Sequence, residues 1–220
     1  MRIIQILKRE WLQVLILIAP FIVIAIFWSS IPETVPVHWS FSGKVNGYAS
    51  KFWGVFLMPL LNIGIALLLA FLPQIDPKKQ VGYAMRPIKA LRIAVTSFIL
   101  VLSMLMLGVS LGKPIDMALA PAILMPLLFL VIGNYLPQTR PNYFIGVRTP
   151  WTLEDPENWR LTHVFAGRLW VVGSIIFLIL DLAIPSAWTT DLLMPYILLM
   201  VLPPLIYSYV NYRRGQKVLQ

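Results

Sequence analysis

The stretch LQVLILIAPFIVIAIFWS, residues 12–29, contains no charged side chain. A helix needs roughly 20 residues to cross the ~30 Å hydrocarbon core of a bilayer, and this stretch is close to that length. It is longer than the apolar core of a signal peptide, and SIPE follows it instead of a small-x-small cleavage site. We therefore expect a retained membrane-spanning helix here.

The rest of the chain repeats this pattern. Of its 220 residues, 59% are hydrophobic and 12% are charged, against about 25% charged in soluble domains. The surplus of apolar surface requires lipid, so the sequence predicts an all-α integral membrane protein with about six transmembrane helices. Besides residues 12–29, the predicted spans are residues 53–72, 93–111, 118–136, 169–186 and 192–209.

The distribution of Lys and Arg predicts the orientation, because short loops rich in these residues stay on the cytoplasmic side. With the N-terminus inside, all of the 18 Lys and Arg residues except Lys44, Lys51 and Lys113 lie on inner segments. We therefore expect both termini in the cytoplasm. The net charge of +9 does not indicate direct nucleic-acid binding, because the basic residues are scattered between apolar runs.

Two long loops organise the predicted fold, which we expect to be a single membrane unit. Residues 1–92 would form a two-helix region with an extracytoplasmic loop at residues 31–51. Residues 93–220 would form a four-helix region, and its cytoplasmic loop at residues 133–168 is called the motif loop. Functional residues concentrate in loops of this kind, so the candidate site residues are expected there.

The extracytoplasmic loop has the pattern of a small β-hairpin. Val35, Val37, Trp39 and Phe41 alternate with other residues, and Ser-Gly-Lys and Asn-Gly are turn signals. The loop is interpreted either as a structural cap in the aromatic belt of the membrane interface or as a recognition surface. The candidate recognition residues are His38, Trp39, Gly43, Tyr48 and Lys51.

The motif loop contains a helix start at Asp155-Pro156-Glu157, with an N-cap, a proline and an acid in the first turn. We expect an interfacial helix from Pro156 to about Ala166, anchored by Trp159, that leads into the fifth span. Regular structure is not expected before it, because four residues interrupt the chain. These are Pro137, Pro141, Gly146 and Pro150.

The polar side chains of the motif loop suit the binding of an anionic group or a partner surface, since arginine pairs well with carboxylate and phosphate. The alternative is ordinary positive-inside anchoring, with the arginines paired to Glu154, Asp155 and Glu157. The candidate residues are Asn134, Arg140, Asn142, Arg148, Trp151, Trp159, His163 and Arg168.

Few polar residues lie within the predicted spans. Asp181 is a candidate functional group, because an intramembrane carboxylate is costly, although its place near the outer end would relieve part of that cost. Asn62 is expected to form one interhelical hydrogen bond, and Gly108 and Gly112 form a GxxxG pair that favours close helix contact. Several prolines are expected to kink the spans: Pro20, Pro59, Pro121, Pro126, Pro203 and Pro204.

Catalytic and metal-site signatures have little support in this sequence. The chain has no cysteine, which excludes thiolate nucleophiles and Cys-based metal sites. His163 has acids nearby, but no HExxH, GxSxG or P-loop pattern accompanies it. We therefore expect a non-enzymatic protein without a metal or cofactor.

Several strings in the two loops together form an unusual pattern. The motif loop contains GNYLP from Gly133, RPNYFIGVRTPWTL from Arg140, WRLTH from Trp159, and Gly167-Arg168. The extracytoplasmic loop reads PETVPVHW from Pro32, followed by Gly43 and Lys51. These strings resemble the bacterial SdpI-type membrane immunity proteins and their N-terminal region of unknown function. One departure is Asn46, where an Asp is common.

The resemblance implies a multi-pass protein of the bacterial cytoplasmic membrane that gives resistance to a secreted antimicrobial peptide toxin. In the best-known members it also implies signalling, in which a cytoplasmic repressor is held at the membrane. The expected partners are then the lipid bilayer, a peptide toxin outside and a repressor inside. Two alternatives remain open from the residues: a small transporter or flippase that uses Asp181, and a membrane-embedded enzyme that acts on lipid or peptide.

Overall fold

The computed structural model describes residues 2–40, 42–78 and 85–218. Within these ranges, six helices are long and apolar enough to span a membrane. They are Glu10–Ser30, Lys51–Ile75, Arg86–Ser110, Leu119–Gln138, Pro156–Ala183 and Trp188–Gly215. The predicted number of spans is confirmed, and the N-in/C-in orientation stays a prediction.

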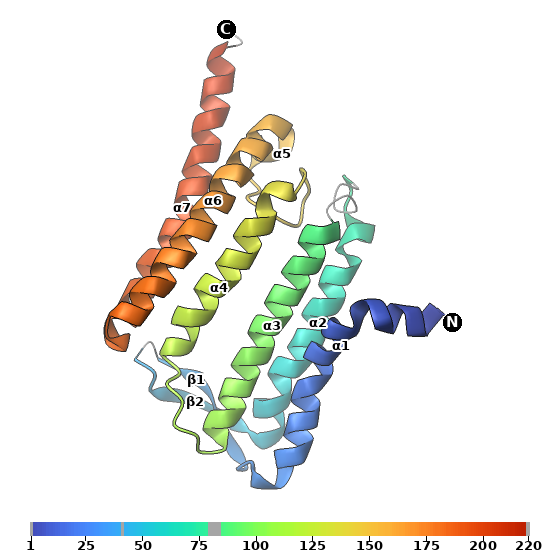
Figure 1. Ribbon diagram of the computed structural model, residues 1–220, viewed down its shortest axis with the longest axis vertical. Coiled ribbons are helices and arrows are strands. Elements are labelled where there is room, and N and C mark those ends of the chain that lie inside the picture. Colours follow the sequence, from blue (N-terminus) through green and yellow to red (C-terminus); the bar gives the residue numbers. More distant parts are fainter. Residues whose placement is uncertain (1, 41, 79–84, 219–220) are drawn as a thin grey trace. The chain divides into compact units, whose positions relative to one another are not determined.

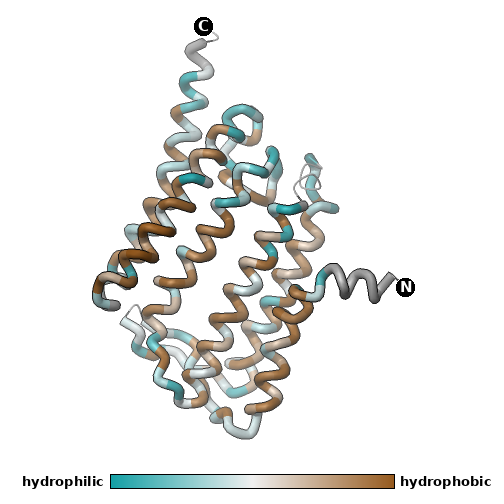
Figure 2. Tube along the Cα trace, in the orientation of Figure 1, coloured by the Kyte–Doolittle hydropathy of each residue, from teal (hydrophilic) through white to brown (hydrophobic). Residues whose placement is uncertain are grey.

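The elements follow the predicted order (Figure 1). Figure 2 shows that hydrophobic residues run along the helices, whereas hydrophilic residues gather near many of their ends. The helices are α1 (Arg2–Phe27), α2 (Lys51–Ile75), α3 (Met85–Ser110), α4 (Leu119–Tyr135), α5 (Pro150–Glu154), α6 (Pro156–Ala183) and α7 (Ser186–Val218). The described residues also form two 3-10 helices, η1 (Trp28–Ser30) and η3 (Leu136–Gln138), and two strands, β1 (Thr34–Trp39) and β2 (Val45–Ser50).

The chain divides into two compact units. The first consists of Met1–Leu68 and Ile93–Pro121, and the second of Leu69–Arg92 and Ala122–Gln220. Within the second unit, Leu72 of α2 and Ile88 of α3 form a buried cluster with Ile145 of the motif loop. The predicted regions 1–92 and 93–220 stay a prediction.

The first unit contains the predicted hairpin, with β1 and β2 paired antiparallel from Thr34–Ser50 to Trp39–Val45. The hairpin prediction is thereby confirmed, although its outermost predicted position, Phe41, lies outside the described residues. The pairing is irregular on both sides of His38. Strand β2 ends at Ser50 and α2 begins at the next residue, so no linker separates them.

The hairpin is anchored to the helices of its unit by Val35, which is 1% exposed. Val35 packs in a buried cluster with Ile24 of α1, Val55 of α2 and Leu107 of α3. Gly54 makes this contact close, because a methyl group at its position would collide with the Val35 side chain. The hairpin therefore rests on the helices as a packed element.

Buried polar side chains join three helices of the first unit. Gln13 of α1 donates a hydrogen bond to the Thr96 hydroxyl of α3 at 3.1 Å. Asn62 of α2 donates to the Thr96 carbonyl at 3.0 Å. The predicted interhelical hydrogen bond of Asn62 is thus present, and it restrains the packing of α2 against α3.

The backbone of α1 is non-helical at Glu10, and Pro20 lies inside the helix. One sequence expectation about helix geometry needs correction. The Gly108–Gly112 pair does not join two helices, because α3 ends at Ser110 and Gly112 has a positive φ of 76°. The Lys113 amide instead donates to the Gly108 carbonyl at 3.0 Å, which closes the helix end.

In the second unit, α4, α6 and α7 form a buried cluster that includes Ala122, Phe177 and Met200. Helices α4 and α6 approach closely where Gly133 faces Gly167. A methyl group on Gly167 would lie 2.7 Å from the Gly133 carbonyl oxygen. The two glycines of the GNYLP and Gly-Arg motifs therefore form one helix crossing.

Candidate functional site

Asn142 determines the fold of the first half of the motif loop. Its side-chain amide donates to the carbonyls of Arg140 at 2.8 Å and Ile145 at 3.1 Å. Its carbonyl oxygen accepts from the amides of Phe144 and Ile145, both at 2.8 Å. All four side-chain bonds are made to the backbone, and Asn142 is buried. The residue therefore shapes the loop from within.

His163 holds the second half of the loop against α6. Its Nε2 atom accepts a hydrogen bond from the Val147 amide at 3.0 Å. Its Nδ1 atom pairs with the Trp159 carbonyl at 2.7 Å, one helical turn earlier. Because an amide only donates and a carbonyl only accepts, the ring is neutral with its hydrogen on Nδ1. Both nitrogens of His163 are thus occupied.

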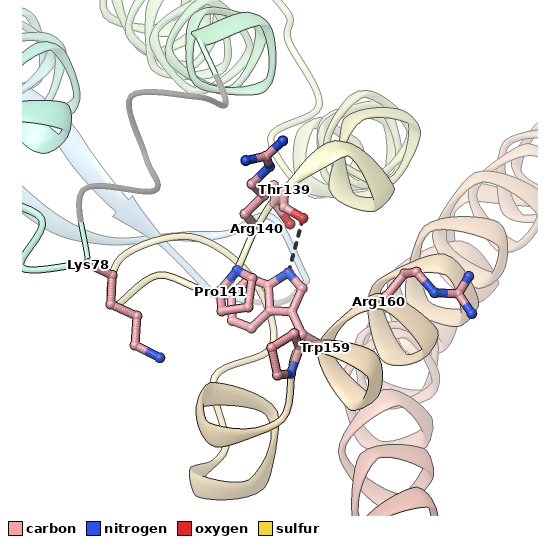
Figure 3. A pocket seen from close by; sticks show the side chains of 7 residues that line it. Lys78, Thr139, Arg140, Pro141, Trp159 and Arg160 are labelled. Atoms are coloured by element: carbon pink, nitrogen blue, oxygen red, sulfur yellow. Dashed lines mark hydrogen bonds between the residues drawn. The ribbon is translucent and has the colours of Figure 1, made fainter.

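Trp159 forms the centre of this arrangement. Its ring stacks on His163 with a centroid distance of 4.0 Å and an interplanar angle of 16°. Its Nε1 atom donates to the Thr139 carbonyl at 3.1 Å (Figure 3). Trp159 is 1% exposed, so the prediction that it anchors a helix in the lipid interface is wrong. Its indole joins the loop to α6 instead.

Gly146 is required by the close approach of the loop to His163. It has a φ of 115°, a region that side-chain-bearing residues rarely adopt. A methyl group at this position would collide with the His163 ring. The Gly-Val-Arg string of the motif therefore brings the Val147 amide to the imidazole.

The loop contains regular structure that the sequence reasoning excluded. Helix α5 begins directly after Thr149, which forms a capping box with Thr152. Pro150 occupies the first turn, where its missing N–H costs nothing. The 3-10 helix η3 likewise contains Pro137. Two of the four interrupting residues, Pro137 and Pro150, thus lie within short helices, whereas Pro141 and Gly146 lie in irregular chain.

The predicted start of α6 is confirmed in detail. The Asp155 carboxylate accepts from the Glu157 amide at 2.8 Å, and Pro156 lies in the first turn. The helix then continues unbroken to Ala183, so the expected interfacial helix to about Ala166 is the first part of one long helix.

Two side-chain hydrogen bonds help to attach the loop to α7. The Trp151 indole donates to the Ser208 hydroxyl at 2.8 Å, and Asn158 donates to the Ser208 carbonyl at 3.0 Å. Trp151 also stacks on Tyr212 with a centroid distance of 5.8 Å. Ser208 and Tyr212 were missed by sequence reasoning, because they are distant in the chain and belong to no recognisable motif.

The predicted motif-loop residues thus separate into two groups. Asn142, Trp159 and His163 are buried and Trp151 is half-buried, so their side chains build the loop. The remaining four have exposed side chains: Asn134, Arg140, Arg148 and Arg168.

The expected pairing of an arginine with an acid of the loop is present at Arg160. Arg160 and Glu157 form a two-point salt bridge at 2.6 and 2.8 Å. Both side chains are exposed, so this pair adds little stability. Arg148 instead donates to the Tyr143 carbonyl at 2.5 Å.

The hairpin presents fewer accessible groups than its sequence suggested. His38 is exposed and Tyr48 is 65% exposed, whereas Trp39 and Gly43 are half-buried. Nδ1 of His38 donates to the Asn46 side-chain oxygen at 2.5 Å, at the position where the sequence departs from the common Asp.

Lys51 has a structural role at the base of the hairpin. Its ammonium group lies 3.7 Å from the Glu33 carboxylate and 4.5 Å from the Trp28 ring centroid. Only 12% of its side chain is exposed. His38 and Tyr48 are therefore the predicted recognition residues that remain most accessible.

Residues 138–208 match the SdpI/YfhL protein family, and residues 15–63 match a domain of unknown function, DUF1648. The chain is also 26% identical to Immunity protein SdpI from Bacillus subtilis (strain 168) over 202 residues, which cover 92% of this chain and 93% of the relative. No solved structure matches it.

This relationship fits the geometry of both loops. The SdpI/YfhL match covers Asn142, His163 and Ser208, so it includes the buried bonds that tie the motif loop to α6 and α7. The other match covers the hairpin and the first part of α2. With its six apolar helices, the chain is a multi-pass membrane protein.

Proposed function

We propose that this chain is a non-enzymatic immunity protein of the bacterial cytoplasmic membrane, which gives resistance to a secreted antimicrobial peptide toxin. The similarity to Immunity protein SdpI along 92% of the chain is the observation that carries this proposal. The occupied nitrogens of His163 support a non-enzymatic role, because neither is available as a general base.

The proposed toxin contact is the exposed part of the hairpin. His38 and Tyr48 offer a ring nitrogen and an aromatic face to the surroundings, and the packing of Val35 keeps the hairpin in place. A preorganised surface of this kind binds a peptide at a lower entropic cost than a flexible loop. Toxin that is held there would be kept from the lipid.

Expression of the chain in a toxin-sensitive bacterial host tests this function. We expect growth in the presence of the peptide, and the His38→Ala/Tyr48→Ala variant should lose most of that protection. Ser50→Ala is the matched control, because Ser50 is also exposed on the hairpin. Sensitivity of cells that carry verified amounts of the unaltered protein in the membrane would contradict the proposal.

We further propose that the exposed arginines of the motif loop contact a cytoplasmic repressor. Arg148 and Arg168 are exposed, and their charge suits an acidic protein surface. Where a small repressor is encoded beside this chain, a fluorescent fusion of it should move to the membrane on exposure to toxin. The Arg148→Ala/Arg168→Ala variant should abolish this movement and keep resistance. A repressor that stays in the cytoplasm with the unaltered protein would refute this part alone.

One observation favours a second candidate function, that of a flippase or small transporter. The Oδ1 atom of Asp181 is buried and has no hydrogen-bond partner among the described residues. Liposomes that contain the purified protein should then move a fluorescent short-chain phospholipid between leaflets, and Asp181→Asn should abolish the movement. Equal movement with the variant would remove Asp181 as the basis of this candidate.

A further inference from the structure

The hydrogen bonds of the hairpin show which backbone groups lie along its two edges. The Lys51 amide donates to the Glu33 carbonyl at 2.8 Å, so these two residues face each other at the base of the hairpin. In antiparallel pairing, hydrogen-bonded pairs alternate with pairs whose backbone groups point away from each other. From the base, the register continues with the pairs Thr34–Ser50, Val35–Ala49 and Pro36–Tyr48. The amide and carbonyl of Tyr48 therefore point away from β1.

The other end of the hairpin gives the same result for Val45. The Ser40 amide donates to the Lys44 carbonyl at 2.9 Å and closes the turn. Val45 pairs with Trp39 at the next position, so its backbone groups also point outward. Among the described residues, Val45 and Tyr48 make no backbone hydrogen bond outside the hairpin. The outer edge of β2 therefore offers amide and carbonyl groups for pairing.

The outer edge of β1 is less suited to pairing. Pro36 faces outward there, opposite Tyr48, and proline has no amide hydrogen to donate. Strand β2 contains no proline and no charged side chain, which are features that commonly protect the edge of a sheet. Its register is regular over residues 47–50. The hairpin therefore leaves β2 as the strand beside which another strand can be added.

The chemistry of this edge selects the kind of partner. Backbone amides and carbonyls at strand spacing are matched by the backbone of another extended segment, which adds to a sheet as a further strand. A peptide that moves from water toward lipid loses the hydration of its own backbone, and a strand edge replaces the lost hydrogen bonds. The Tyr48 side chain, which is 65% exposed, belongs to the same strand and is accessible to side chains of an added strand.

We propose that β2 binds an extended peptide segment as the third strand of this sheet, with hydrogen bonds to the backbone groups of Val45 and Tyr48. In the function proposed above, this segment belongs to the toxin, so the identity of the partner rests on that function. The pairing itself rests only on the register of the hairpin. Main-chain hydrogen bonds then supply affinity, and the Tyr48 side chain supplies selectivity.

Binding of a strand-forming peptide tests this proposal. The probe is a fluorescent peptide of alternating threonine and valine with a lysine at each end. It is titrated onto the full-length protein in phosphatidylcholine nanodiscs, and binding is measured by fluorescence anisotropy. We expect Tyr48→Pro to weaken binding about fivefold more than Tyr48→Ala, because only proline removes the amide hydrogen. Thr34→Pro is the matched control, because the Thr34 backbone points outward from the opposite edge and its change should leave the affinity unaltered.

A change in the probe gives the same test without altering the protein, in case Tyr48→Pro does not fold. Methylation of every backbone nitrogen of the peptide should weaken binding at least about tenfold, because several hydrogen bonds are lost together. Hydrogen exchange of residues 45–50 should slow with the unmethylated peptide alone. Equal binding of the two peptides, an equal loss in Thr34→Pro, or no binding to the unaltered protein would overturn the proposal.

The remaining outcomes separate this inference from the immunity function and from self-association. Protein that protects cells but does not bind the probe would refute strand pairing and leave immunity standing. Binding of the probe without protection would support strand pairing and refute immunity. If light scattering in detergent shows that Tyr48→Pro converts dimers into single copies, the edge belongs to a second copy of the chain, and the proposal is refuted.

Discussion

His163 shows how a single side chain connects two separate strings of the motif loop. It accepts from the Val147 amide, pairs with the Trp159 carbonyl and stacks on the Trp159 ring. Gly146 makes this possible, because any larger residue there would collide with the imidazole. The Gly-Val-Arg and Trp-Arg-x-Thr-His strings are thus two halves of one packed contact.

Gly146→Ala should destabilise the protein by about 2 kcal/mol or more, because it combines an unfavourable φ with a collision. Thermal unfolding of the detergent-solubilised protein measures the effect. Gly64→Ala is the control, since a methyl group there meets nothing within 4 Å and alanine favours the helix. Equal melting temperatures for the two variants would contradict the described contact.

His163→Ala should lower stability by roughly 2–4 kcal/mol, because it leaves the buried Val147 amide without its acceptor and removes the stacking on Trp159. The same unfolding assay applies. Arg168→Ala, an exposed position on the same helix, should change stability by less than about 0.5 kcal/mol. A small effect at His163 would show that the ring does not support the loop.

At the scale of elements, the sequence was sufficient to predict the features that depend on near neighbours in the chain. The six helices, the hairpin and the Asp155 cap follow from apolar length, alternation and turn residues, which act between near neighbours. The buried roles of Trp159 and His163 could not be predicted in this way. Their partners Thr139 and Val147 are set by how the loop folds back, which no local pattern encodes.

The crossing of α4 and α6 gives a prediction at this scale. Gly133→Ala should separate the two helices and destabilise the protein by about 1–3 kcal/mol, because its methyl group would lie 2.8 Å from Trp170 and 3.1 Å from the Gly167 carbonyl. Gly173→Ala on α6 is the control, because it meets only the flexible end of Met200. The melting temperature of Gly133→Ala should be lower than that of Gly173→Ala. The reverse order would argue against a close contact between α4 and α6.

The docking of the hairpin against the helices gives another prediction at the scale of elements. Gly54→Ala should push Val35 out of its cluster and loosen β1 and β2, while the helices remain folded. Hydrogen exchange of residues 34–39 and 45–50 should then increase, with Gly64→Ala again as the reference. Unchanged protection of the strands would mean that Val35 does not hold them.

At the scale of the whole molecule, the orientation rests on the positive-inside pattern alone. The chain lacks cysteine, so single introduced cysteines report on one place each. Ser42→Cys and Arg148→Cys are both exposed positions, and an impermeant thiol reagent added to intact cells should label the first and not the second. Labelling of both from outside would overturn the proposed sides for toxin and repressor.

The direct passage of β2 into α2 has a mechanical consequence. Ser50 is followed directly by the first helical residue, and Lys51 contacts Glu33 and Trp28. The hairpin therefore cannot move independently of the axis of α2. A force applied to the hairpin would therefore be transmitted to α2 as a torque. Insertion of two glycines after Ser50 would make this connection flexible, and the hairpin would no longer transmit force to α2.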